Sequence, residues 1–321
     1  MTMSQPIFLH DHQDFGELLR IVEERENIVA ALVEKDYWIM HCLYGLKKQG
    51  YVFQLKGGTS LSKGFGLIHR FSEDIDIHIN PPNELAINEN PKNNNQSNIQ
   101  KKKAYYDTLA WEIKIDGIIS VERDEAFDDL NRFNSGGIRL HYKSLTNSQP
   151  GVKEGILLEA GFDNVAPNGP VTISSWAYET ARETAGLNII DNRAVNIVCY
   201  DHRYTFVEKL QTIASKFRKE ITTGQVATNY MRQYYDVYCL LADRDVQDFI
   251  GKEPYLKHKQ LRFSKEDFEL PIAQNEAFLL NDNILRETFQ KRYEGTSTLY
   301  YKSQPAFIDI LARIAEFKEK L

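Results

Sequence analysis

The chain has 321 residues, 42% hydrophobic and 26% charged, with a net charge of −6 at pH 7. This length and composition are ordinary for a globular protein with one large domain or two modest ones. The negative charge excludes the broad basic surface of many nucleic-acid binders, and no apolar run approaches the roughly 20 residues of a membrane span.

The N-terminal third alternates helical and strand patterns around a glycine pair, Gly57 and Gly58. Apolar residues recur at helical spacing after the candidate cap Asp14. The proline pair 81–82 ends the last strand of this region, and the asparagine-rich stretch 80–100 is expected to be a surface loop. The predicted elements are a helical region over 13–49 whose second helix covers 34–48, a strand over 51–55, a helix over 61–69 and a strand over 71–79.

The middle of the chain has mainly strand character, and the helical period dominates from Tyr204 onward. We therefore expect an α+β protein with a mixed-sheet domain over 1–200, including the N-terminal helices, and a helical domain over 201–321. The predicted elements of the middle are a helix over 101–116, strands over 117–122, 138–142, 155–162 and 195–200, a turn-rich break at 167–170 and a helix over 180–186. Those of the C-terminal part are helices over 206–220, 230–241, 265–270 and 305–320.

The stretch Ser72–Ile79 is the most informative part of the sequence. In a strand, its period of two places Asp74 and Asp76 on one face with His78, and the isoleucines on the other. The isoleucine face requires a core. The two carboxylates repel each other, and a hard divalent cation such as Mg²⁺ would relieve that repulsion.

The segment Lys56–Lys63 precedes this strand and contains a Gly-Gly-Thr-Ser turn. Such a turn can direct backbone N–H groups at an anion, so Gly57, Gly58 and Ser60 are candidates for holding a phosphate. Lys63 lies one helical turn beyond Ser60 and could neutralise phosphate charge. A phosphate cradle followed by a carboxylate pair predicts phosphoryl or nucleotidyl transfer.

These residues resemble the AbiEii/AbiGii toxin family of the nucleotidyltransferase superfamily. The resemblance rests on Glu34–Trp38, on GGTSLSK over 57–63 and on RFSEDIDIHI over 70–79. Two later segments, 206–210 and 232–238, are similar to the family's lysine and aspartate motifs and would supply Lys209 and Asp236. The resemblance gives no role to Glu34, Lys35 or Asp36.

The resemblance implies a DNA-polymerase-β-like mixed-sheet core with flanking helices. It also implies transfer of a nucleotide from an NTP with Mg²⁺, with the tRNA 3′ end as the most plausible acceptor and an antitoxin as a possible partner. Superfamily members usually add a third carboxylate from a neighbouring strand. Glu159 is the best candidate because it interrupts an apolar strand, and Asp163 and Asp116 are weaker rivals.

Each candidate also has a plainer interpretation. A helix lysine such as Lys209 is ordinarily solvated, whereas Asp236 lies in an apolar helix and needs a partner, either Lys209 or a nucleotide hydroxyl. Arg70 would steer phosphate or pair with Glu73. His78 is expected to line the site rather than bind metal. The aromatic residues of the Glu34–Trp38 motif, Tyr37 and Trp38, are expected in the core.

Three basic clusters could supply a local contact for RNA, although such runs are usually just solvated faces. We favour Lys216, Arg218 and Lys219, because they follow Lys209 by about two turns of one predicted helix. At that distance from Lys209, the three residues are expected to flank a cleft that forms where the helical domain folds back over the sheet domain. The other two clusters are 101–103 and 252–262.

Two alternatives remain open from the sequence: the same transfer to a protein or a small molecule, and a non-catalytic regulator that binds a nucleotide. The three cysteines lack the spacing of a disulfide framework or a zinc site, which fits a reducing cytoplasm. The stretch 1–14 has neither the cationic start nor the apolar run of a signal peptide. We therefore expect a cytoplasmic protein with no membrane contact.

Overall fold

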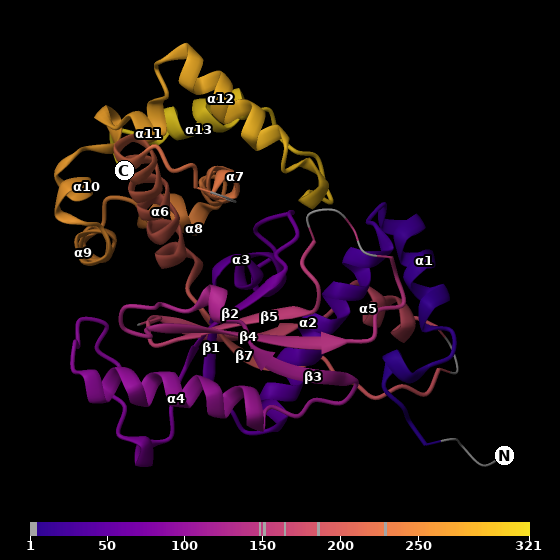
Figure 1. Cartoon of the computed structure of the whole chain (residues 1–321). Coiled ribbons are helices and arrows are strands. Elements are labelled where there is room, and N and C mark those ends of the chain that lie inside the picture. The colour runs from indigo at the N-terminus through magenta and orange to yellow at the C-terminus, as the bar shows by residue number, and fades with distance from the viewer. Residues whose placement is uncertain (1–4, 148, 150–151, 164, 185–186, 228–229) are drawn as a thin grey trace. The chain divides into compact units, whose positions relative to one another are not determined.

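The computed structural model describes residues 5–147, 149, 152–163, 165–184, 187–227 and 230–321 (Figure 1). The chain divides into two compact units. Unit 1 comprises residues 1–64 and 71–200, and unit 2 comprises residues 65–70 and 201–321. The short segment 65–70, which the sequence placed in the sheet domain, thus belongs by its contacts to unit 2.

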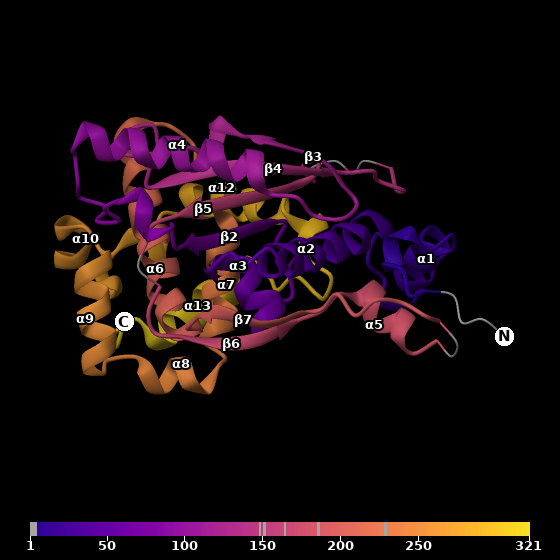
Figure 2. The same ribbon diagram turned by 90° about the horizontal axis from the view of Figure 1, so that it is seen from below.

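Unit 1 is built on one mixed sheet of seven strands in the order β3-β4-β5-β2-β1-β7-β6 (Figure 2). The central strand β2 pairs antiparallel with β1 and parallel with β5, so both of its hydrogen-bonding edges are occupied. The strands are β1 (Phe53–Lys56), β2 (Asp74–Ile79), β3 (Ile118–Arg123), β4 (Ser135–Tyr142), β5 (Ile156–Gly161), β6 (Asn168–Ile173) and β7 (Ala194–Tyr200).

Four helices of at least seven residues accompany this sheet in the described part of unit 1: α1 (Phe15–Glu26), α2 (Ala30–Lys48), α4 (Gln96–Glu112) and α5 (Trp176–Arg182). Helix α4 packs against β3 and β4, while α2 contacts β7, β5 and α5 (Figure 1). Tyr37 and Trp38 of α2 are buried, which confirms them as core aromatics. The expected isoleucine face of β2 is also in the core, because Ile75 and Ile77 have no exposed surface.

The predicted helix over 61–69 is wrong in its second half. A short helical turn, α3 (Gly57–Thr59), continues as a π-helical turn over Ser60–Gly64 and stops there. Gly66 follows with φ +65°, a left-handed conformation that a right-handed helix cannot contain. Residues 65–70 then pass through unit 2 before the chain returns to β2.

Two further predictions in unit 1 are corrected. The asparagine-rich stretch is not a loop throughout, because α4 already begins at Gln96 and the Asn95 side chain caps it by accepting the Ser97 N–H at 2.9 Å. The segment 167–170, predicted as a turn-rich break, instead begins the edge strand β6, where proline is tolerated. The predicted helix 180–186 begins earlier, at Trp176, and residues 185–186 lie outside the described part.

Unit 2 is helical (Figure 1). Helix α6 packs on α7, α9 and α11, and α7 also contacts α12 and α13. Its helices are α6 (His202–Thr223), α7 (Met231–Leu240), α8 (Arg244–Phe249), α9 (Glu253–Arg262), α10 (Lys265–Glu269), α11 (Glu276–Leu279), α12 (Asn283–Glu294) and α13 (Phe307–Phe317). The predicted fold class, an α+β protein with a mixed sheet and a helical C-terminal part, is therefore confirmed. The helices α8, α9, α11 and α12 were not predicted.

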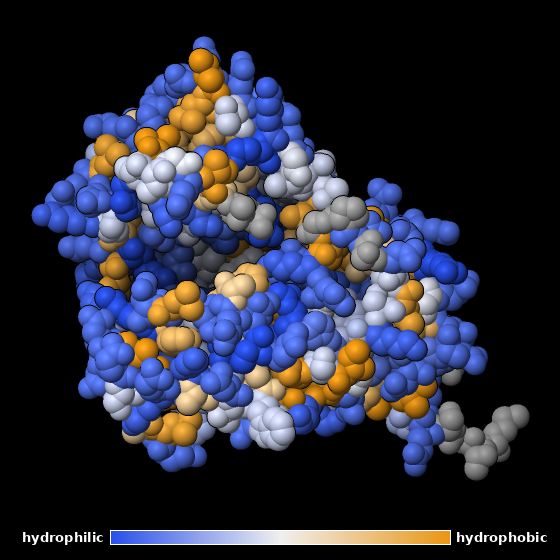
Figure 3. Space-filling model, in the orientation of Figure 1, coloured by the Kyte–Doolittle hydropathy of each residue, from blue (hydrophilic) through white to orange (hydrophobic). Residues whose placement is uncertain are grey.

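The surface drawn in Figure 3 is mainly hydrophilic, with hydrophobic side chains scattered over it. Among the described residues, no helix is both long enough and apolar enough to cross a membrane.

Candidate active site

The carboxylate face of β2 is formed as the sequence predicted. Asp74 and Asp76 are half-buried on one face, while Ile75 and Ile77 between and after them are fully buried on the other. His78 lies on the carboxylate face but is only 7% exposed. Its Nε2 lies 3.6 Å from a carboxylate oxygen of Glu89, and burial lowers its pKa below the usual value. His78 therefore lines this face near its far end.

Glu159 lies beside the aspartates on the neighbouring strand. In the parallel β2–β5 pairing, Asp76 is opposite Glu159 and Asp74 is opposite Leu157. Residues opposite each other in a ladder direct their side chains to the same face. Burial, together with the charges of Asp76 and Asp74, raises the pKa of Glu159 to about 7. The third carboxylate thus joins a crowded acidic face.

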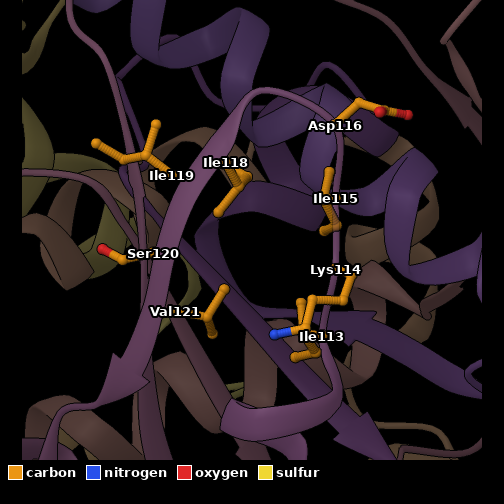
Figure 4. A pocket seen from close by; sticks show the side chains of 8 residues that line it. All are labelled: Ile113, Lys114, Ile115, Asp116, Ile118, Ile119, Ser120 and Val121. Carbon is orange, nitrogen blue, oxygen red and sulfur yellow. The ribbon is translucent and has the colours of Figure 1, made fainter.

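Neither rival candidate for the third carboxylate is paired with Asp74 or Asp76 in the sheet. Asp116 precedes the edge strand β3 and lines a cavity of about 270 Å³ between residues 113–116 and that strand (Figure 4). Two strands, β4 and β5, lie between β3 and β2 in the sheet. Asp163 follows the end of β5, where it interacts with His78 at the far end of the carboxylate face. The sheet geometry therefore favours Glu159.

The glycine turn is fitted to the aspartates. Gly57 has φ +74°, and a Cβ at this position would collide with Oδ2 of Asp76. The hydroxyl of Thr59 donates to the Asp74 carbonyl at 2.5 Å. Ser60 is fully buried and its hydroxyl donates to the Gly57 carbonyl at 2.9 Å, which holds the turn closed. Gly58 is buried beside it.

Lys63 extends from the end of this turn and is fixed by two neighbours. Its Nζ lies 2.7 Å from Asp36 Oδ1 and 4.7 Å from the centre of the Trp176 ring. Asp36 also accepts the Trp176 N–H at 3.0 Å. Burial raises the pKa of Asp36, and the Lys63 charge opposes that rise. Asp36, which had no assigned role, therefore positions Lys63.

The remaining charged residues of the Glu34–Trp38 motif bind loop backbone. Glu34 accepts the Leu145 N–H at 2.8 Å, and Lys35 donates to the Lys153 carbonyl. Lys35 also forms an ion pair with Glu73 at 3.4 Å. The expected pair of Arg70 with Glu73 is thereby wrong, because Glu73 is bound by Lys35 and Arg70 belongs to unit 2. Three successive charged residues, Glu34–Asp36, in a buried helix are a sequence signal that each needs a polar partner.

Lys153 is a site residue that the sequence did not indicate. Its Nζ donates to both carboxylate oxygens of Asp74, at 3.1 and 3.0 Å, and lies 4.7 Å from the Phe127 ring centre. No motif marks it, because it stands in a loop before β5 between ordinary residues. Lys56 of β1 lies opposite Asp76 in the antiparallel register and adds a second positive charge to this face.

In unit 2, Lys209 and Asp236 come together with Arg70. Asp236 is fully buried and accepts from Arg70 Nε at 2.6 Å and from a terminal guanidinium nitrogen at 2.7 Å, and Lys209 Nζ lies 3.0 Å away. Burial alone would raise the pKa of Asp236, but the charges of Arg70 and Lys209 outweigh it and lower the pKa. Lys209 is thus the partner predicted for Asp236.

The acidic face of unit 1 has the donor chemistry of a divalent-cation site. It offers hard oxygen ligands, and burial together with the charges of Asp76 and Asp74 raises the pKa of Glu159. These three carboxylates are not drawn tightly together. Among the described residues, only His202, Asp243 and Asp245 have ligand atoms all within 4.8 Å of one another. That group is in unit 2, and Asp243 serves there as the cap of α8.

The basic clusters are largely occupied by internal partners. Arg218 pairs with Asp267 at 2.8 Å and with Glu266 at 3.0 Å, whereas Lys219 is exposed. In the other clusters, Lys102 donates to Asn134 at 2.7 Å, and Lys259 is buried and donates to the Leu321 carbonyl. The favoured cluster therefore carries less available charge than its sequence indicated.

Comparison with known proteins gives one family match. A family model described as nucleotidyl transferase AbiEii toxin, type IV toxin–antitoxin system, matches residues 41–313, which is most of the chain. The match includes the glycine turn, β2, β5 and the helices that carry Lys209 and Asp236. No curated protein matches the chain. The resemblance identified from the motifs is confirmed.

Proposed function

Since the chain belongs to the AbiEii nucleotidyl transferase toxin family of type IV toxin–antitoxin systems, we propose that its transfer reaction occurs on the carboxylate face of β2. One observation carries this proposal: Asp74, Asp76 and Glu159 share a sheet face, and the Gly57 turn lies against Asp76. The family implies an NTP substrate and an antitoxin in the same system.

We assign Mg²⁺ binding to Asp74, Asp76 and Glu159, whose oxygens suit that ion. When bound there, the ion would neutralise charge on the triphosphate and on the attacking oxygen. Gly57 leaves room for Asp76 to lie against the turn, and Gly58 and Ser60 complete the phosphate cradle. Catalysis then comes from positioning and charge neutralisation, with no covalent enzyme intermediate.

Lys63 is assigned to the triphosphate. An ion pair with Asp36 and a cation–π contact with Trp176 fix the position of its ammonium, so Lys63 is preorganised. Holding a cation in place before the substrate arrives removes reorganisation cost from the reaction. Lys209 is assigned to the triphosphate as well, and Asp236 holds the Lys209 ammonium.

We propose RNA as the acceptor, most plausibly the tRNA 3′ end. A terminal hydroxyl of the acceptor attacks the α-phosphate in line, the bond to the β-phosphate breaks, and pyrophosphate leaves. This assignment rests on the family resemblance, and the exposed Lys219 with its neighbour Lys216 is the surface we assign to RNA contact. The phosphate contacts would be few, because the net charge is −6.

The test is to incubate the purified full-length protein and its Asp76→Asn variant with each α-³²P NTP, Mg²⁺ and total RNA. We expect label on RNA of tRNA size with the wild type alone, and loss of that label when Mg²⁺ is chelated. Label on protein or on a small molecule would replace the acceptor. Binding of an NTP with no release of pyrophosphate would contradict catalysis at this face.

A further inference from the structure

Contacts of both its side chain and its backbone hold Lys153 against Asp74, the first aspartate of β2. Its Nζ bridges both carboxylate oxygens of Asp74, at 3.1 and 3.0 Å. The side chain of Lys153 is 28% exposed and that of Asp74 is 17% exposed, so water screens this pair only in part. The Phe127 ring lies 4.7 Å from the same ammonium.

The backbone of Lys153 is fixed separately. Its N–H donates to Glu73 Oε2 at 2.9 Å, and its carbonyl accepts from the ammonium of Lys35. Lys35 and Glu73 are themselves a buried ion pair at 3.4 Å, with side chains 1% and 5% exposed. A buried pair therefore holds both backbone polar groups of Lys153, and through them it directs the Lys153 side chain toward Asp74.

A buried ion pair is costly unless its geometry is good and its remaining donors and acceptors are hydrogen-bonded. Here Lys35 and Glu73 hydrogen-bond the backbone of Lys153, a residue that is itself charged. A purely structural clamp would serve as well with any side chain at position 153. The side chain that is present places a positive charge on a carboxylate that we assign to metal binding.

We propose that Lys153 is a tethered cation that occupies the Asp74 carboxylate in the metal-free protein and competes with the divalent ion for it. Lys35 and Glu73 act as positioning residues for this lysine. This inference rests on the proposed function, because it takes Asp74 as a metal ligand. Loading of the site then requires the ammonium to leave Asp74, and the divalent ion takes its place on the carboxylate.

Direct competition predicts a larger effect from removing Lys153 than from removing another nearby charge. Lys56 is the matched control, because it faces Asp76 across the β1–β2 pair and its charge also acts on Glu159. Both variants remove one positive charge from the same face. Lys153 alone of the two has a contact with Asp74 in the described structure.

The experiment measures Mn²⁺ binding to the full-length, chelator-treated protein by titration with electron paramagnetic resonance, without nucleotide. We expect Lys153→Met to bind Mn²⁺ about three- to tenfold more tightly than wild type, and Lys56→Met to differ less than twofold. Lys153→Arg keeps the charge and should bind as wild type does. In thermal unfolding without metal, Lys153→Met should be less stable than wild type, and Mn²⁺ should raise its melting temperature by more.

Equal affinity of the wild type and Lys153→Met would overturn the inference, as would an equal gain in Lys56→Met. The positioning role has its own test. The Lys35→Met/Glu73→Gln double variant removes both buried charges together and should reproduce part of the gain. It should add nothing when Lys153 is already methionine, and an undiminished effect in that background would overturn the positioning role.

Mn²⁺ binding to Asp76→Asn distinguishes a failure of the Lys153 competition from a failure of the metal site. If wild type binds Mn²⁺ and Asp76→Asn does not, the metal site stands whatever Lys153 does. If the wild type and Asp76→Asn bind Mn²⁺ equally, the metal site of the proposed function is wrong and this inference falls with it.

Discussion

The carboxylate of Asp76 lies where any residue other than glycine at position 57 would place its Cβ. The two residues come from different elements, the turn after β1 and the strand β2, and β1 and β2 are paired next to each other. Gly57 also has φ +74°, so both its backbone and its missing side chain are required. The phosphate turn and the acidic strand are therefore one fitted unit.

Replacing Gly57 by Ala should reduce nucleotide transfer by about 100-fold, because the new methyl group displaces the Asp76 carboxylate by a large part of an ångström. The left-handed backbone should also cost about 1–2 kcal/mol of stability. Transfer rates and urea unfolding measure the two effects. Gly50→Ala is the control, since Gly50 has φ +86° and nothing within 4 Å of the added Cβ. It should lose similar stability and keep its rate.

Asp76→Asn should lower the transfer rate by roughly two to three orders of magnitude, because a neutral amide cannot replace a charged ligand at a charge-neutralising centre. The fold should remain, since the side chain is only half-buried. Asp116→Asn is the matched change at the rejected candidate and should leave the rate intact. Wild-type activity of Asp76→Asn with unchanged Mg²⁺ dependence would remove the carboxylate site.

We expect Glu159 to make the metal-free protein less stable as the pH rises. Its pKa is raised from 4.5 to about 7 in the folded state, so the folded protein holds the proton more tightly than the unfolded chain does. The contribution of Glu159 to the free energy of unfolding is fully present below about pH 4.5 and is lost as the pH rises through 7. The neutral Glu159→Gln variant avoids this loss. At pH 8 without metal, it should exceed wild type by about 1–3 kcal/mol.

Urea unfolding at pH 5 and pH 8 in chelator measures this difference, which should be small at the lower pH. The same variant should be deficient in transfer, because it lacks the proposed third metal ligand. A stability gain with full activity would keep the electrostatics and reject Glu159 as a ligand. No gain at pH 8 would reject the crowding itself.

The roles of Lys209 and Asp236 can be distinguished by how much stability each variant loses. Asp236→Asn leaves Arg70 and Lys209 near a neutral group in a buried place, and should cost about 3–5 kcal/mol. Lys209→Met leaves Asp236 with its two hydrogen bonds from Arg70, and should cost only about 1–2 kcal/mol. We predict that Lys209→Met still abolishes transfer. A folded variant that transfers at the wild-type rate would make Lys209 purely structural.

The structure separates the residues of the proposed RNA surface by their partners. Lys219→Gln should weaken RNA binding and reduce its dependence on salt by roughly one logarithmic unit of slope per lost phosphate contact, because Lys219 is exposed. Arg218→Gln should act mainly on stability, because Arg218 is paired with Asp267 and Glu266. NTP binding should be unchanged in both. Equal RNA labelling at every salt concentration would reject this surface or the RNA acceptor.

The sequence alone determined the local features whose cause is local. A period of two placed Asp74 and Asp76 opposite the isoleucines, because side chains alternate in any strand. A glycine pair before a helical pattern located the turn, and a lone acid in an apolar run identified Glu159 as exceptional. The ends of the elements were less secure, because the helix over 61–69 stops at Gly64 and α4 begins early at an asparagine cap.

Tertiary structure alone decided which residues meet. Strand order placed Glu159 opposite Asp76, and no local pattern encodes the pairing of β2 with β5. Asp36 holds Lys63, Lys35 and Glu73 hold the backbone of Lys153, and Arg70 belongs with Asp236 rather than Glu73. These partners lie 27 to 166 residues apart or on different elements. A buried charge requires a partner, but its identity is set only when the chain has packed.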